Sequence, residues 1–122
     1  MLRAILVASL LMTAPALAGG SCFSIREFHG WRAPDAKTIY IRVAQTRYFR
    51  LDLGASCSQL TFPGAHLITE TRGPDLMCSG IDWDLAVSTG TPGSIPMHCI
   101  VKQQTELTPD EVAAIPKQFK PN

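Results

Sequence analysis

KTIYIRV at residues 37–43 and YFRLDL at residues 48–53 are the stretches that decide the fold of this chain. Apolar residues occupy every second position in both: Ile39, Ile41 and Val43, then Phe49, Leu51 and Leu53. A period of two is typical of strands with one buried face, so the two stretches are predicted to form an antiparallel hairpin. Facing residues must share parity, so the loop has either three residues (44–46) or five (44–48). A three-residue loop favours a positive φ at its last residue, which suits Thr46 poorly, so both lengths stay open.

The opposite face of this hairpin carries the candidate ligand-binding residues, which are Tyr40, Arg42, Tyr48 and Arg50. With the three-residue loop, Tyr40 lies opposite Arg50 and Arg42 opposite Tyr48, as arginine–tyrosine cross-strand pairs. Such a face would suit a glycan, a carboxylate or a phosphate. The alternative is a solvated sheet face whose long side chains shield the backbone, and antiparallel sheets normally have one. The solvated face is the favoured interpretation.

The remaining segments predict a mainly β chain. Further strands are expected at 25–31, 65–71, 84–88 and 96–103, and the first of them is expected to stop at the turn cluster Ala33-Pro34-Asp35. Turn signals recurring this often indicate a small antiparallel meander or barrel-like domain of about five or six strands.

One short C-terminal helix is expected after these strands. Thr108-Pro109-Asp110-Glu111 forms a capping box with proline at the first helical position, and Pro116 ends the helix. A helix this short is not stable alone, so Val112 and Ile115 are predicted to pack on the sheet.

The first 18 residues have the three parts of a secretory signal peptide. Arg3 supplies the basic start, residues 4–12 the apolar run, and Ala16 and Ala18 the small residues of a cleavage site. The apolar run is shorter than the roughly 20 residues that cross a bilayer, so no transmembrane segment is expected. The predicted organisation is a signal peptide at 1–18, a single disulfide-stapled β domain at 19–116 and a flexible tail at 117–122. Cleavage near Ala18 would release the protein to the periplasm or the medium.

The mature chain has four cysteines, which are Cys22, Cys57, Cys78 and Cys99. An even count in a small exported domain indicates two disulfides, and the wide spacing argues against a metal site. The sequence does not choose among three connectivities; the preferred one joins Cys57 to Cys78 and Cys22 to Cys99. Lipidation at Cys22 is disfavoured, because Leu17 lies five residues upstream rather than three and one of the other cysteines would stay unpaired.

Charge and motif content exclude several classes of function. Without Arg3 the chain has ten basic and ten acidic residues, which argues against nucleic acid as a partner. No cofactor motif is present. The acidic pair Asp82 and Asp84, together with His66, could form a hydrolase site, but such aspartates more often satisfy the amides of a turn.

Trp31, next to Arg32, also has two interpretations. An exposed aromatic beside an arginine would suit a binding edge, whereas a tryptophan that covers one end of a small core is the more common case.

An ordered set of motifs resembles a family of uncharacterised exported bacterial proteins, common in proteobacteria and catalogued as a domain of unknown function. The set is Cys22-Phe23, Arg26-Glu27, Trp31-Arg32-Ala33-Pro34-Asp35, Thr38 to Val43, Tyr48 to Leu53, Cys57, Cys78-Ser79-Gly80-Ile81-Asp82, Cys99-Ile100-Val101 and Leu107 to Val112. The resemblance covers nearly all of the mature chain. It implies export and a shared cysteine framework, and it implies no activity.

The leading hypothesis is a non-enzymatic periplasmic or envelope-associated module whose partner is an envelope protein or a small anionic or glycan ligand. Two alternatives are kept: a small hydrolase that uses Asp82, Asp84 and His66, and an inhibitor or purely structural module.

Overall fold

The computed structural model describes residues 22–71, 73 and 75–122. The expected signal peptide at 1–18 and its cleavage site near Ala18 lie outside the described residues. The strands are β1 (Phe23–Ser24), β2 (Phe28–Asp35), β3 (Thr38–Val43), β4 (Arg47–Leu53), β5 (His66–Thr71), β6 (Leu76–Met77), β7 (Trp83–Ser88), β8 (Met97–Cys99) and β9 (Val101–Glu106). The helices are α1 (Pro109–Ala114) and four 3-10 turns, η1 (Ile25–Glu27), η2 (Ser58–Thr61), η3 (Gly80–Asp82) and η4 (Lys117–Phe119).

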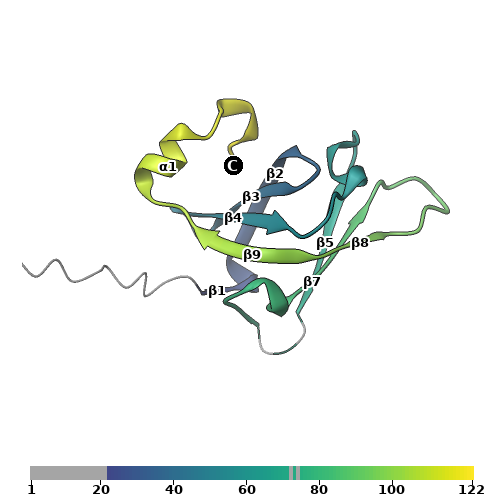
Figure 1. Ribbon diagram of the computed structural model, residues 1–122, viewed down its shortest axis with the longest axis horizontal. Helices are drawn as coiled ribbons and strands as arrows, with labels where there is room; N and C mark the ends of the chain where they lie inside the picture. The colour runs from purple at the N-terminus through teal and green to yellow at the C-terminus, as the bar shows by residue number, and fades with distance from the viewer. Residues whose placement is uncertain (1–21, 72, 74) are drawn as a thin grey trace, which may run out of the picture.

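All strand pairs are antiparallel, which confirms the mainly β prediction (Figure 1). Four strands form one sheet in the order β2-β3-β4-β9, and three form another in the order β5-β7-β8. The short strands β1 and β6 pair separately. The described residues thus contain nine strands rather than five or six, because two of them have only two residues and one expected strand is divided.

The hairpin has the three-residue loop. Val43 is paired with Arg47, so residues 44–46 connect β3 to β4. The positive φ of this loop falls on Ala44, at 53°, and not on Thr46, where a three-residue loop usually places it. The loop therefore has one of the two lengths that parity allows, and the residue with positive φ is the first of the loop instead of the last.

Two predicted strands have different bounds. The first was expected at 25–31, but 25–27 is a 3-10 turn and β2 continues through Pro34 to Asp35. Proline is tolerated because β2 is an edge strand of its sheet, where a missing N–H breaks no ladder. The strand expected at 96–103 is two strands: β8 pairs with β7, and β9 pairs with β4. The chain changes sheets at Ile100, whose side chain is exposed.

One hydrophobic core joins the two larger sheets. The inward side chains of β3 and β4, such as Ile41 and Phe49, are fully buried, and they share a cluster with Trp83 and Val87 of β7. Phe23 of β1 lies between them, with its ring centroid 4.9 Å from that of Phe49 and 6.0 Å from that of Trp83. The outer face of the hairpin is therefore free for other contacts.

The two disulfides are Cys22–Cys78 and Cys57–Cys99, so the preferred pairing was wrong. The β1–β6 pair, with Phe23 opposite Met77, carries Cys22 to Cys78. Cys57 is held beside β2 by a hydrogen bond from its N–H to the carbonyl of Ala36, at 2.7 Å, and Cys99 reaches it at the end of β8. A short loop between Cys57 and Cys78 looked favourable along the chain, but Cys57 is bound to Ala36 at the end of β2, whereas Cys78 follows β6, which pairs with β1.

The C-terminal segment, residues 107–122, lies over the outer face of the four-stranded sheet (Figure 1). The capping box of α1 is confirmed: the Thr108 hydroxyl accepts from Glu111 N–H, and the Glu111 carboxylate accepts from Thr108 N–H. Ile115 is buried and Val112 half-buried. The residues expected to form a flexible tail include η4 and the buried Pro121. A side chain at Gly30 would meet the backbone oxygen of Asn122 at 2.9 Å, so glycine lets this segment approach β2.

Candidate functional site

The outer face of the sheet is arranged in rows that cross the strands. Arg32, Tyr40 and Arg50 form one row, and Gly30, Arg42 and Tyr48 form the next. The predicted cross-strand pairs, Tyr40 with Arg50 and Arg42 with Tyr48, are therefore present. The C-terminal segment lies above both rows and divides the four candidate residues between two pockets.

The first pocket, of about 210 Å³, holds Tyr40 and Arg50 beneath α1. The charge of Arg50 is already compensated there, because its Nε donates to the Asp52 carboxylate at 3.2 Å. Glu111 also lines this pocket. Hydrogen bonds from the backbone and side chain of Thr108 hold the Glu111 pKa below its ordinary value, and the positive charge of Arg50 lowers it further. Tyr40 and Arg50 thus belong to the part of the outer face on which α1 packs.

The second pocket, of about 600 Å³, is different in charge. We call it the basic pocket, and its lining residues are Arg42, Tyr48, Lys117, Lys120, Pro121 and Asn122. Three of these side chains are cationic and none is acidic. Lys120 Nζ lies 5.7 Å from the centroid of the Tyr48 ring, within the range of a cation–π contact. Arg42 Nε donates to the carbonyl of Gln45 at 3.1 Å, which orients the guanidinium and leaves its terminal nitrogens as donors.

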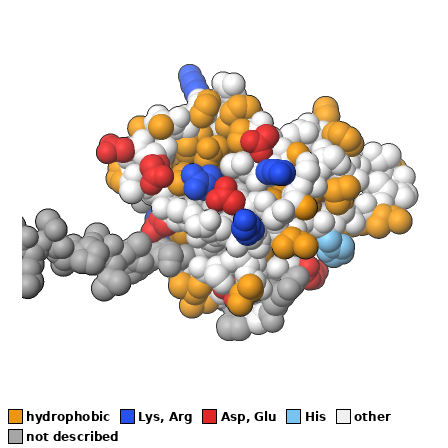
Figure 2. Space-filling view, viewed as in Figure 1, with side chains coloured by type: hydrophobic (Ala, Val, Ile, Leu, Met, Phe, Trp, Pro, Cys, Tyr) orange, Lys and Arg blue, Asp and Glu red, His pale blue; other side chains and the backbone are white. Residues whose placement is uncertain are grey.

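None of the three cations forms an ion pair with a carboxylate in the part of the chain that the structure describes. Figure 2 shows hydrophobic side chains gathered over the C-terminal segment, with charged side chains around them. Lys117 and Lys120 are not among the candidate residues predicted from the sequence, because they belong to the stretch that is predicted to be a flexible tail. Their signal was the pair of lysines three residues apart, on either side of Phe119 in KQFKP.

The residues of the hydrolase alternative are not brought together. Asp82 Oδ2 accepts from the N–H groups of Cys78 and Ser79, at 2.8 and 3.0 Å, so it satisfies a turn. Asp84 lies on β7 opposite Glu70, whereas His66 lies opposite Ser88. Four residues of strand separate Ser88 from Asp84, about 13 Å at the usual rise. Acid and base partners of one reaction must reach the same substrate atom, which this spacing prevents.

Asp84 has a different histidine partner, His98 of β8. Its Oδ1 lies 3.7 Å from His98 Nδ1, and the two side chains are 38% and 78% exposed. A contact this open contributes little to stability. In the described residues no group of three or more His, Cys, Asp or Glu side chains is placed to hold a metal ion.

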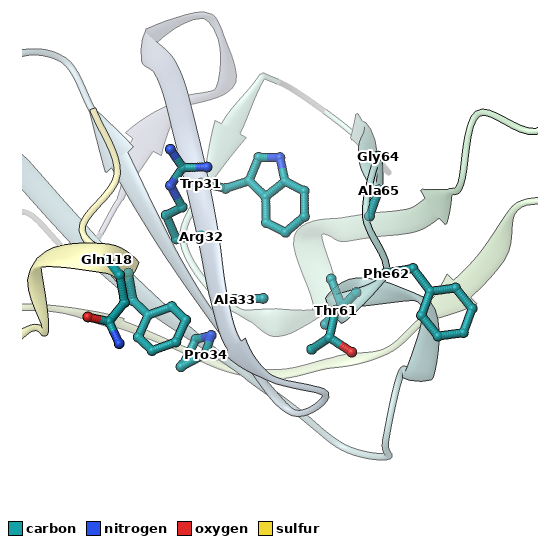
Figure 3. Close-up of a pocket in the computed structure, with 11 residues that line it drawn as sticks. Trp31, Arg32, Ala33, Pro34, Thr61, Phe62, Gly64, Ala65 and Gln118 are labelled. Atoms are coloured by element: carbon teal, nitrogen blue, oxygen red, sulfur yellow. The ribbon is translucent and has the colours of Figure 1, made fainter.

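A third pocket, of about 460 Å³, borders β2 (Figure 3). We call it the β2 groove. One wall comes from residues 60–65 and the other from Gln118 and Phe119 of η4. Trp31 lines the groove and is half-buried, so it both contacts the core and borders the groove.

No family model, no curated protein and no solved structure matches this chain. Among the described residues, no helix has the length and apolar character needed to cross a membrane.

Proposed function

We propose that this chain is an exported, non-enzymatic binding module, and that it binds a small anion bearing a phosphate or a carboxylate in the basic pocket. The observation that carries the proposal is the grouping of Arg42, Lys117 and Lys120 around Tyr48, with no acidic side chain in the lining. The grouping joins a strand of the sheet to a segment about seventy residues later in the chain.

Three unpaired cations in one pocket repel one another, and an anion relieves that repulsion. The guanidinium of Arg42 offers paired N–H donors that match a carboxylate or a phosphate. The two lysines supply mobile point charges that adapt to the shape of the ligand. Tyr48 adds an aromatic surface on which a sugar ring could rest. The same chemistry therefore serves a phosphate ester and an acidic sugar.

Several further features support export. Two disulfides are typical of proteins in oxidising compartments, which include the bacterial periplasm. The sulfur of Cys22 is in a disulfide, which leaves no thiol for lipid attachment. The signal-like first 18 residues and the resemblance to exported proteobacterial proteins agree with a periplasmic location.

The test is calorimetric titration of the oxidised protein with two probes, inorganic phosphate and glucuronate. Low ionic strength is needed, because salt screens exposed charges. Replacement of Lys117 or Lys120 by alanine should weaken binding of the preferred probe about tenfold, which is the value of one charge-assisted hydrogen bond. The comparison of probes distinguishes a phosphate ligand from an acidic sugar.

Lys102→Ala is the matched control, because Lys102 is exposed and does not line the basic pocket. It should leave the affinity within twofold, or about 0.4 kcal/mol. If neither probe binds, or if Lys102→Ala weakens binding as much as Lys120→Ala, the basic pocket is not an anion site.

A further inference from the structure

The β2 groove is formed around the free edge of a strand. β2 is the terminal strand in the order β2-β3-β4-β9, so among the described strands only β3 pairs with it. Figure 3 shows β2 between the two walls, with the Trp31 ring on the side of Gly64 and Ala65 and with Gln118 on the other side. The edge of β2 therefore borders the groove, together with the Trp31 ring.

The hydrogen-bond pattern determines which backbone groups reach this edge. The N–H of Ala44 donates to the carbonyl of Glu27 at 2.8 Å, so the even-numbered residues of β3 direct their backbone groups toward β2. Their partners, Gly30 and Arg32, use their own groups in that ladder. Trp31 lies between them, so its N–H and C=O point away from β3 and into the groove. Within the described chain, no turn, loop or side-chain hydrogen bond involves the Trp31 backbone.

The edge that is available is short. Arg32 is paired with Tyr40 and Asp35 with Thr38, so Ala33 and Pro34 together face the single residue Ile39. This is a β-bulge, and Pro34 has no N–H to donate. Bulges and prolines at an edge limit the length of any strand that can be added. The groove therefore fits a short extended segment rather than another sheet.

Charge selects among such segments. Arg32 is the only charged side chain in the groove lining, and it is exposed. No described carboxylate pairs with it. Opposite charges on facing residues stabilise antiparallel pairs, and like charges destabilise them. Pairing of two β2 edges would bring two Arg32 side chains and two bulges together, which disfavours a second copy of this chain.

We propose that the β2 groove binds an extended peptide segment by strand addition, with an acidic side chain facing Arg32 and apolar side chains facing Trp31 and Phe62. Phe62 is 52% exposed at the rim of the groove and would be covered by the added segment. Backbone hydrogen bonds would supply affinity and the alternating side chains specificity, as in other strand-addition complexes. This site is separate from the basic pocket, although η4 lines both: Gln118 and Phe119 face the groove, and Lys117 and Lys120 face the basic pocket.

The experiment is an amide-resolved NMR titration of the full, disulfide-bonded chain with three blocked hexapeptides. The first alternates valine and glutamate, the second alternates valine and lysine, and the third is the glutamate peptide with alternate amides N-methylated. The glutamate peptide should shift resonances at 30–34 and 60–65 and bind about tenfold tighter than the lysine peptide. The N-methylated peptide should lose binding, because it lacks the donors that a ladder requires.

Arg32→Glu should reverse the preference between the glutamate and lysine peptides, while Lys102→Glu, as the control, should not change it. Equal binding of the N-methylated peptide would overturn strand addition. Shifts confined to Tyr48 and residues 117–122 would mean that the acidic peptide binds only in the basic pocket, which also overturns this proposal but supports the other. Sedimentation that reveals a dimer with the same shifted resonances would identify a second copy as the occupant and reject the peptide.

Discussion

Replacement of Gln104 by leucine should destabilise the domain strongly, because one buried amide joins three parts of the fold. Gln104 of β9 is 9% exposed and points into the core. Its Oε1 accepts from Trp83 Nε1 at 2.8 Å, and its Nε2 donates to the carbonyl of Met77 at 3.0 Å. The side chain thus connects the four-stranded sheet to β7 and to the short β1–β6 pair.

The expected magnitude follows from the partners that are left behind. Leucine is one atom shorter than glutamine and has no polar atom, so it occupies most of the same space but replaces neither hydrogen bond. The substitution leaves the Trp83 N–H and the Met77 carbonyl buried without these hydrogen bonds, at about 1–3 kcal/mol each. Burial of the more apolar side chain returns about 1–2 kcal/mol. With both ranges taken at their middle, the net loss in the free energy of unfolding should be about 2.5 kcal/mol.

Urea unfolding followed by far-ultraviolet circular dichroism measures this loss without relying on Trp83 fluorescence, which the substitution itself perturbs. With an m-value of about 1.5 kcal/mol/M, the midpoint should fall by about 1.7 M. Gln103→Leu is the matched control, because Gln103, the residue next to Gln104, is exposed on the other face of β9. This control should change the free energy of unfolding by less than about 0.5 kcal/mol. Equal midpoints for the two variants would refute the role given to the Gln104 amide.

Three further predictions concern stability. Gly80→Ala should lower the unfolding temperature, because the added methyl group would meet the backbone oxygens of Val101 and Lys102. Gly54→Ala, whose methyl group would make only ordinary contacts, should be tolerated in the same thermal unfolding measurement. A double serine variant removes the Cys57–Cys99 disulfide, which closes a loop with a sequence separation of 42. In the chain-entropy model its loss should lower the free energy of unfolding, measured in urea, by about 4 kcal/mol. The lowered pKa of Glu111 means that its capping contribution is present above the ordinary glutamate pKa and is lost as the pH falls through the folded value. The protection factors of the α1 amides, which correct for the slower intrinsic exchange in acid, should therefore fall below about pH 4.3, and Glu111→Gln should remove that dependence.

The hairpin could be predicted because its signal is local. Alternation in β3 and β4 fixes which face is buried, and parity then limits the register to two loop lengths. The capping box of α1 is local in the same way, since Thr108 and Glu111 need only each other. Such features depend on residues a few positions apart, and the structure has them where the sequence placed them.

The disulfide pairing could not be predicted, because it depends on which strands meet. Cys22 reaches Cys78 only through the β1–β6 pair, and two strands of two residues leave no periodic signal. The division at Ile100 was missed for a related reason: β8 and β9 are adjacent in sequence, yet each is paired in a different sheet. Sheet membership is decided by the whole core and not by local pattern.

Part of the basic pocket could likewise be predicted from the sequence. Arg42 and Tyr48 followed from the hairpin, but the division of the face did not, because nothing in the sequence of residues 117–122 indicates where that segment lies. Pro121 is buried in the structure, and Lys117 and Lys120 line the same pocket as Arg42. Arg50, which looked equivalent to Arg42, is occupied by Asp52.

The most direct test of the anion site is an amide-resolved NMR titration of the oxidised protein with inorganic phosphate at low ionic strength, which locates the ligand as well as detecting it. Binding in the basic pocket should shift the resonances of Tyr48 and residues 117–120 together, with one common saturation curve, and Lys120→Ala should weaken that curve about tenfold. Shifts of similar size at Lys37 and Lys102, rising without saturation, would mean that phosphate only screens surface charge, and this result would contradict the proposed function.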